Sequence, residues 1–293
     1  MTLIKKTKNS LSFWILLSIL SINAELFSGE NIGSHARNSD TLRPKSARIS
    51  LQITVGFRMV HAPSFLKSIP EKHLDILYAI NRLDQQSLYK VDSIVVPDSM
   101  VDNLLYYSPF PQNLNLLDSV KKIIFLHYPI QAFAIYESGK LTRWGPVSMG
   151  RKAAPTPSGL FYCNWRSKRQ ISTIDPSWIM NWYLNIENFE GISIHQYALP
   201  GYPASHGCVR MLEKDAYWLY HWADQWKLDK KGKILSQGTP VIIAGKYQFD
   251  IRHLWKNLPF NSSATHVSPE EMEGEIKPFI QNILKQEKLR SSE

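Results

Sequence analysis

Residues 201–211 have the sequence GYPASHGCVRM and contain Cys208, one of only two cysteines in the chain. A cysteine attacks as its thiolate, so a reactive one needs an imidazole or a positive field nearby to lower its pKa below the usual value of about 8.5. His206 lies two residues before the cysteine, and His195 ends the apolar segment GISIH at residues 191–195. This pattern predicts a nucleophilic Cys208 served by two candidate histidines.

The first of these histidines is the stronger candidate for the general base. A strand over residues 191–195 would hold the His195 ring on a rigid edge that faces the cysteine loop. The next residue, Gln196, is expected to orient that ring through its backbone carbonyl, giving a nucleophile, a base and an orienting group. In an extended loop His206 and Cys208 point the same way, so His206 is predicted to shape the site or to help activate the thiol.

The neighbours of the cysteine suggest how a substrate is held. Gly207 has no side chain beside the point of attack, so the backbone amides of Gly207 and Cys208 are predicted to face a developing oxyanion. Arg210 is a candidate clamp for a substrate carboxylate, or equally a partner for a structural Asp or Glu. Ser205 and Tyr202 complete the set of predicted substrate-binding residues.

These residues form part of a pattern that resembles the L,D-transpeptidase catalytic domain of the YkuD-type family. Its central element is Ser-His-Gly-Cys at residues 205–208, and the resemblance covers about residues 121–248. The other similar segments are Gln131, Tyr136, VSMG at 147–150, PTPSGLF at 155–161 and GTPV at 238–241. The interval from His195 to Ser205 is shorter than in the best-known members, which leaves the preferred acyl acceptor open.

The resemblance implies a mainly β fold, a β-sandwich with a short helix after the cysteine loop. It also implies a two-step acyl transfer on peptidoglycan stem peptides. Cys208 would attack a tetrapeptide stem and release its terminal D-residue, and an amine of a second stem would then take the acyl group from the thioester. His195 matches the histidine that accepts and returns the proton, and His206 matches the family's second histidine. No cofactor or metal is implied.

Other interpretations fit the same residues. With water as the acceptor the enzyme would be an L,D-carboxypeptidase, and without catalysis the chain would be a peptidoglycan-binding protein. Zinc could be held by His195, His206 and Cys208 if His221 on the following segment joined them. Cys163 is expected to be a buried strand residue, but a disulfide to Cys208 is the alternative in an oxidising compartment.

Short segments rich in β-branched and apolar residues, separated by turns with Gly, Pro, Asn and Ser, occupy the chain from residue 121 onward. They favour an antiparallel sandwich or barrel. The predicted strands are 123–126, 132–136, 160–163, 192–195 and 241–244. An acidic start at residues 213–215, followed by apolar residues at helical spacing as far as Trp226, predicts a helix directly after the cysteine.

Tryptophan is frequent in this half of the chain. Trp222 and Trp226 have helical spacing and are expected in the core. The candidates for the wall of a substrate groove are Trp144, Trp165, Trp178 and Trp182.

The first residues indicate export. Three lysines precede an apolar run at residues 11–22, which predicts a signal peptide at residues 1–24 and a location in the periplasm or cell wall. The run is short for a membrane span, so the membrane is a partner only if this segment is retained. The formal net charge of +9 suits an anionic cell envelope, and no nucleic-acid motif is present.

Two further regions flank the segment that resembles the catalytic domain. Residues 25–47 are polar and are expected to form a flexible lead-in. Residues 48–100 combine an extended start at 53–55, a helical pattern at 71–80 and a β-branched run at 94–97, which predicts a small α/β module. Residues 252–293 are expected to form a charged C-terminal extension with one helix at 269–288.

The second half of the small module resembles the end of a LysM-type repeat, which binds glycan strands. The similar features are Asn81 after the helix, the spaced Leu88 and a closing Val-Pro strand. The opening Gly-Asp of such repeats is absent, and an unrelated helical prodomain is the alternative.

Overall fold

The computed structural model describes residues 55–251 and 253–292. The predicted signal peptide and the polar lead-in lie outside these residues, as does most of the strand expected at 53–55. No helix in the described ranges is long and apolar enough to cross a bilayer.

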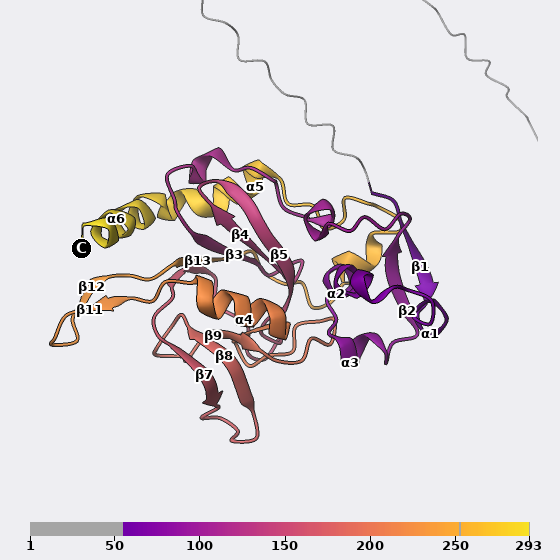
Figure 1. Ribbon diagram of the computed structural model, residues 1–293, viewed down its shortest axis with the longest axis horizontal. Helices are drawn as coiled ribbons and strands as arrows, with labels where there is room; N and C mark the ends of the chain where they lie inside the picture. The colour runs from indigo at the N-terminus through magenta and orange to yellow at the C-terminus, as the bar shows by residue number, and fades with distance from the viewer. Residues whose placement is uncertain (1–54, 252, 293) are drawn as a thin grey trace, which may run out of the picture. The chain divides into compact units, whose positions relative to one another are not determined.

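A nine-stranded sheet forms the centre of the protein, in the order β6-β13-β3-β4-β5-β10-β9-β8-β7 (Figure 1). Its strands are β3 Ile123–His127, β4 Ala132–Glu137, β5 Lys140–Ser148, β6 Gly159–Tyr162, β7 Arg166–Ile171, β8 Ile179–Asn185, β9 Ser193–Gln196, β10 Val209–Met211 and β13 Pro240–Ala244. Two neighbouring pairs are parallel, β13 with β3 and β10 with β9, and the others are antiparallel. The sheet is therefore mixed, whereas the frequent turns had suggested an antiparallel one.

The two halves of this sheet enclose a shared apolar core. Ile124 and Ile135 from β3 and β4 belong to the same buried cluster as Leu184, Ile194 and Met211 from β8, β9 and β10. Side chains from two facing sheet segments interdigitate in this way in a β-sandwich. The mainly β fold expected from the sequence is thus confirmed.

The helix α4, Glu213–Trp222, follows β10 directly, as the sequence predicts. Its acidic first turn suits the positive end of the helix dipole, and Ala216 and Leu219 are buried on the side that faces the sheet. The helix ends at Trp222, four residues before the predicted end. Ala223 is extended, and Asp224 bonds to Thr239 instead of continuing the helix: its N–H donates to the Thr239 hydroxyl, and its carbonyl accepts from the Thr239 N–H.

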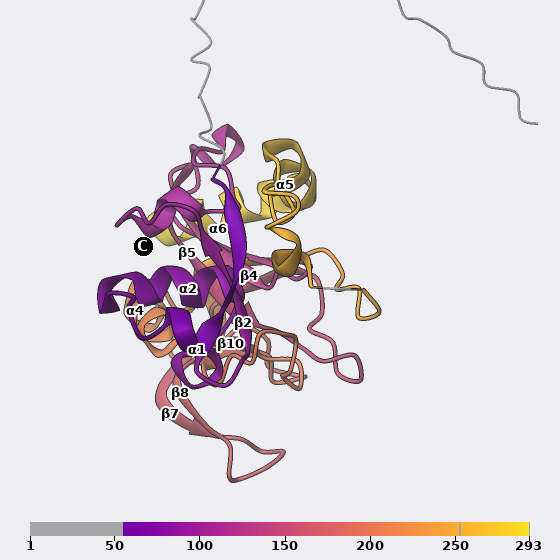
Figure 2. The same ribbon diagram turned by 90° about the vertical axis from the view of Figure 1, so that its right-hand side faces the viewer.

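The N-terminal module has the α/β character that the sequence predicts, and it faces the viewer in Figure 2. It consists of β1 Phe57–His61, α1 Ala62–Phe65, η1 Glu71–His73, α2 Leu74–Asn81, α3 Gln85–Leu88 and β2 Ser93–Pro97. The strands β1 and β2 pair antiparallel, and Leu77, Leu88 and Ile94 are buried in a small core of the module.

The C-terminal residues form α5 Pro269–Ile276, η5 Lys277–Phe279 and α6 Ile280–Ser291. They are not merely an exposed charged extension, because Met272, Ile276 and Ile283 are fully buried in the same core as β3, β4 and β5. The remaining short elements are η2 Leu104–Tyr107, η3 Asn115–Leu117, β11 Lys227–Leu228, β12 Ile234–Ser236 and η4 Leu254–Asn257.

Candidate active site

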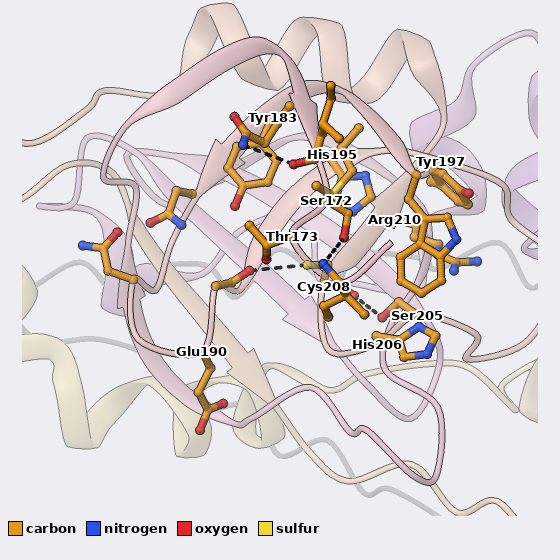
Figure 3. Close-up of a pocket in the computed structure, with 18 of the residues that line it drawn as sticks. Ser172, Thr173, Tyr183, Glu190, His195, Tyr197, Ser205, His206, Cys208 and Arg210 are labelled. Carbon is orange, nitrogen blue, oxygen red and sulfur yellow. Dashed lines mark hydrogen bonds between the residues drawn. The ribbon is translucent and has the colours of Figure 1, made fainter. Parts of the chain in front are cut away.

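Cys208 lies on the wall of a cavity of about 340 Å³, at the end of the loop that leads into β10 (Figure 3). The predicted residues His195, Ser205, His206 and Arg210 line the same cavity. In the close-up, Cys208 lies between His195 and His206. The structure thus brings together residues that the sequence separates by up to 15 positions.

The pairing of β9 with β10 explains this arrangement. The two strands are parallel, with His195 opposite Arg210 and Ile194 opposite Val209. Partner side chains in such a pair share one face of the sheet, and side chains two residues apart along a strand share it as well. His195 and Arg210 therefore lie on the face that Cys208 approaches, while Ile194 and Val209 point into the core.

The thiol of Cys208 has two hydrogen-bond partners. The hydroxyl of Ser193 donates to Sγ at 3.3 Å, and Sγ lies 3.6 Å from the carbonyl oxygen of Gly191, to which the thiol donates. A thiolate would keep the first contact, because Ser193 is the donor, and would lose the second. Ser193 is fully buried, and the sequence interpretation missed it. The only signal was its place two residues before His195 in the same strand.

His195 is held in one orientation inside the protein. Its ring is 4% exposed and is stacked on Tyr183, with the centroids 6.3 Å apart. Nδ1 lies 2.9 Å from the carbonyl oxygen of Gln196, which confirms the predicted hydrogen bond. A carbonyl oxygen only accepts, so Nδ1 carries the proton and Nε2 of the neutral ring keeps a free lone pair.

Burial sets the charge of this histidine. Desolvation by burial, opposed by the Gln196 hydrogen bond and aided by the nearby charge of Arg210, lowers the pKa of His195 to about 4. The ring is therefore neutral at neutral pH. No hydrogen bond joins His195 to Cys208 in the described ranges, so the role of His195 as the base remains a prediction.

His206 lines the cavity beside Trp178, with the ring centroids 4.6 Å apart. Its Nδ1 is buried and has no hydrogen-bond partner among the described residues. Partial burial lowers the pKa of His206, and the charges of Arg151 and Arg210 add to this effect. A mostly neutral ring beside the thiol fits the predicted part in shaping the site.

The cysteine loop is braced by its own hydrogen bonds. The Ser205 hydroxyl donates to the Cys208 carbonyl and accepts from the Gly207 N–H at 3.2 Å. The Thr156 hydroxyl donates to the Gly207 carbonyl at 2.8 Å. Gly207 has a φ of +110°, a conformation that favours glycine.

These contacts alter two of the sequence predictions. Ser205 lines the cavity, but its hydroxyl holds the loop together, so the structure gives it a bracing position and not a free substrate-binding group. The Gly207 N–H is already bound within the loop, while the Cys208 N–H has no partner among the described residues. Of the two predicted oxyanion donors, the structure leaves only the Cys208 amide free.

Arg210 presents a cation to the cavity. Its guanidinium lies over the ring of Tyr197, 4.6 Å from the centroid, and burial lowers the pKa of Arg210. No described carboxylate pairs with it, so the structural ion pair considered for Arg210 is not formed with any of these residues. Tyr197 also lines the cavity and was not predicted.

Tyr202 does not have the position that the sequence suggested. Its side chain is half exposed and stacks on His253, and it is not among the residues that line the cavity. The chain turns at Gly201, which has a φ of +84°. The backbone carbonyl of Tyr202 accepts a hydrogen bond from Ser148. The Tyr202 side chain therefore lies outside the cavity lining, and its part in substrate binding stays a prediction.

The structure does not support the two alternatives of a Cys163–Cys208 disulfide and a zinc site completed by His221. Both cysteines are free, and Cys163 is fully buried, so the disulfide is not formed. Burial also raises the pKa of Cys163 far above its usual range, which makes it an unreactive thiol. His221 packs against Tyr217 on α4 and does not line the cavity, so the zinc interpretation lacks the further ligand it required.

The tryptophans divide between wall and core. Trp165 and Trp178 line the cavity, as predicted. Trp144 is 2% exposed in the core, and Trp182 packs against Tyr217 away from the cavity lining.

Residues 121–243 match the family model described as YkuD, L,D-transpeptidase catalytic domain. This match confirms the resemblance inferred from the sequence. A comparison with curated proteins finds no similar sequence.

Solved structures of several L,D-transpeptidases are similar to part of the chain. An L,D-transpeptidase from Stackebrandtia nassauensis is 21% identical over 43% of this chain and 57% of its own, with a TM-score of 0.36. One from Mycobacterium smegmatis is 20% identical over 43% of this chain and 59% of its own, with a TM-score of 0.34. L,D-transpeptidase 3 from Mycobacterium tuberculosis is 19% identical over 43% of this chain and 61% of its own, with a TM-score of 0.34. The aligned part spans less than two thirds of each of these structures.

Proposed function

We propose that the L,D-transpeptidase catalytic domain at residues 121–243 acts on peptidoglycan tetrapeptide stems, with Cys208 as its nucleophile. The observation that carries this proposal is the shared cavity of a free thiol and a buried, neutral histidine whose Nε2 is available as a base. A thiol and an imidazole on one cavity wall are the parts that acyl transfer through a thioester needs.

The first step forms the thioester. Nε2 of His195 takes the proton of the Cys208 thiol, and Sγ attacks the carbonyl carbon of the third stem residue at its L-centre. The C–N bond to the terminal D-residue breaks, and its amine leaves with the proton that His195 returns. The Ser193 hydroxyl already donates to Sγ, so it stabilises the negative charge before attack.

Two groups are placed to assist this step. The Cys208 N–H is free to donate to the oxyanion of the tetrahedral intermediate, in the part that oxyanion donors have in acyl transfer. The unpaired guanidinium of Arg210 is available to a substrate carboxylate, because no described carboxylate occupies it. It also attracts the thiolate, since both groups face the cavity.

The second step transfers the acyl group. An amine of a second stem attacks the thioester carbonyl, the C–S bond breaks, and the proton of the amine passes through His195 to the thiolate. With a D-amino acid as the acceptor the product is an exchanged terminal residue, and with water the enzyme is an L,D-carboxypeptidase.

Digestion of isolated peptidoglycan sacs tests this function. Sacs are incubated with the protein, cleaved to muropeptides and analysed by mass spectrometry. The proposal expects new crosslinks or exchanged terminal residues with the wild type and neither with Cys208→Ala. Shortened stems alone would identify the carboxypeptidase, and an unchanged muropeptide profile with the wild type would refute both activities.

The N-terminal module carries a second candidate function, the binding of glycan strands. Its helices lie between two strands that pair antiparallel, and the side chain of Asn81 binds the backbone of Val95 through both of its polar atoms. Asn81 is thus the residue that ties the helix to the closing strand in the segment that resembles a LysM-type repeat. Co-sedimentation of Cys208→Ala with sacs, and its release by soluble glycan fragments, tests this binding.

The first residues support a proposal for the location of the protein. We propose export to the periplasm or the cell wall, on the basis of the lysines and the apolar run at residues 1–24. Cell fractionation with N-terminal sequencing of the mature protein tests this: a protein recovered from the cytoplasm with residues 1–24 intact would contradict export.

A further inference from the structure

The loop that joins β9 to the cysteine element contacts the N-terminal module at its midpoint. The Asp84 N–H donates to the Leu199 carbonyl at 3.0 Å, and the Leu199 N–H donates to Oδ2 of Asp84 at 2.8 Å. Leu83 and Pro200 form an isolated antiparallel bridge beside this pair. Two backbone segments far apart in sequence are thus joined as if they were two short strands.

The contact is closely packed. Leu199 is fully buried, and Leu83 is 5% exposed. Gly201 lies so close to the module that an added Cβ would be 2.9 Å from Cδ2 of Leu83. The midpoint of the loop therefore has little room to shift while the module stays in place.

Asp84 uses each carboxylate oxygen for a different backbone amide. Oδ1 accepts from the Ser87 N–H at 2.7 Å and caps the start of α3, while Oδ2 accepts from Leu199. A hydrogen bond to an ionised carboxylate is stronger than a neutral one. One side chain thereby stabilises the module and holds the loop of the catalytic domain.

The loop carries this restraint to the active site through Tyr197, two residues before Leu199. The Tyr197 ring packs edge-on against His195, with the centroids 6.0 Å apart, and it lies under the guanidinium of Arg210. The Tyr197 N–H is bound to the Met211 carbonyl at 3.2 Å. A shift of the loop would therefore move the Tyr197 ring, which supports both His195 and Arg210.

We propose that Asp84 is a positioning residue of the active site: through Leu199 it holds the loop so that Tyr197 keeps Arg210 and His195 facing Cys208. This inference rests on the proposed function for its catalytic consequence. Its geometric part, the placement of Arg210 beside the thiol, is independent of any activity.

Asp84→Asn separates the two tasks of the side chain. Asparagine is as good an N-cap as aspartate, so its amide oxygen can retain the bond to Ser87. Its amide nitrogen cannot accept from the Leu199 N–H, so this side-chain bond to the loop is lost, while the backbone bond from the Asp84 N–H to the Leu199 carbonyl remains. The matched control is Asp75→Asn, which removes the negative charge that pairs with Lys214 on α4 and leaves the loop untouched.

The placement of Arg210 is read from the chemical reactivity of Cys208 in the full-length protein. The alkylation rates are measured with anionic iodoacetate and with neutral iodoacetamide, and their ratio reports the cation beside the thiol. Cys163 is fully buried and does not compete. We expect this ratio to fall several-fold in Asp84→Asn and to keep its wild-type value in Asp75→Asn. A wild-type ratio in Asp84→Asn, or an equal fall in the control, would overturn the inference.

The catalytic consequence is measured as the acylation of Cys208 by a tetrapeptide donor. We expect kcat/KM to fall about tenfold in Asp84→Asn, the loss typical of one charge-assisted hydrogen bond. The melting temperature is measured in parallel. A loss that merely followed the melting temperature, with an unchanged alkylation ratio, would show a structural role and refute positioning. If the alkylation ratio fell in Asp84→Asn but the tetrapeptide donor did not acylate the wild type, the proposed function would be refuted. The inference about the placement of Arg210 would then still stand.

Discussion

At the scale of single residues, the burial of His195 has a consequence for stability. Its pKa is about 4 in the folded protein and lies near 6.5 in the unfolded chain, so the unfolded chain binds the proton more readily between these values. The stability associated with the neutral ring is complete above pH 6.5 and is lost as the pH falls toward 4. We expect the free energy of unfolding to drop by up to roughly 3 kcal/mol across this window.

Urea unfolding at pH 7, 5 and 4 measures this effect. Other buried histidines also titrate, so the wild type is compared with His195→Gln, which keeps a polar side chain but has no proton to gain. The difference in the free energy of unfolding between the wild type and His195→Gln should change by up to roughly 3 kcal/mol between pH 7 and pH 4. Parallel pH profiles for the two proteins would contradict the burial argument for His195.

Ser193 gives the second prediction at this scale. In Ser193→Ala the thiolate loses the hydroxyl that donates to Sγ, which costs about 1 kcal/mol for a hydrogen bond of this kind. We expect the alkylation of Cys208 by iodoacetamide at pH 7 to slow about fivefold. Ser167→Ala, which removes a hydroxyl bound to the Arg169 carbonyl, is the control. If Cys208 were alkylated at the same rate in Ser193→Ala and Ser167→Ala, the Ser193 hydroxyl would not stabilise the thiolate.

The sequence predicts some of these residues better than others. His206 lies two residues before Cys208, and Gln196 follows His195 directly, so the placement of each pair requires only local geometry. Ser193 meets Cys208 across two strands, and the strand register that joins them has no local signal. The hydrogen bond that occupies the Gly207 amide depends on how the loop turns, which the residue types alone did not specify.

At the scale of secondary structure, the ion pair at the start of α4 gives a third prediction. Asp215 is 3% exposed and accepts two hydrogen bonds from Arg143 on β5, at 3.0 and 2.7 Å. Burial raises the pKa of the Asp215 carboxyl, and Arg143 opposes this. Arg143→Met leaves a buried carboxyl without its partner, so we expect a loss of about 3 kcal/mol in the free energy of unfolding.

The double variant Arg143→Met, Asp215→Leu is the control for this pair. With both polar groups replaced by apolar ones, no unpaired charge stays buried, and most of the lost stability should return. Chemical denaturation of the three proteins gives the comparison. A double variant less stable than the single one would show that the pair has another role.

The elements themselves were predictable where the chain is apolar. The apolar runs of β3, β4 and β13 are buried on both faces, and the sequence predicted all three. The strand β7 has the sequence RSKRQI at the edge of the sheet, and its charged residues hid its strand character. The end of α4 was misplaced because the tertiary contact between Asp224 and Thr239 terminates it.

At the scale of the whole molecule, Arg82 joins three distant regions. It ends α2 in the left-handed conformation with a φ of 60° and is 2% exposed. Its guanidinium donates to the Ile130 carbonyl at 2.7 Å and lies near the rings of Trp144 and Trp255. Desolvation lowers the pKa of Arg82 to about 9, which still leaves it charged at neutral pH. A sequence gives no sign of such a junction, because each partner comes from a different part of the chain.

The C-terminal helices give the prediction that belongs to this scale. The charged composition of residues 252–293 hid the few apolar residues that reach the core. Met272→Ala creates a cavity at a fully buried position, so we expect a loss of about 2 to 5 kcal/mol in the free energy of unfolding. Leu289→Ala, at a position 40% exposed, should change it by less than about 0.5 kcal/mol. Equal small effects in denaturant unfolding would show that these helices are dispensable for the core.

The covalent intermediate gives the most direct test of the central claim. The protein is incubated with a tetrapeptide donor, or with a carbapenem as an acylating mimic, and its intact mass and peptide map are determined. The account predicts one acyl group per chain, located on Cys208, with none on Cys163 and none in Cys208→Ala. A wild-type protein that gains no mass on Cys208, while its stem peptides are nevertheless processed, would contradict it.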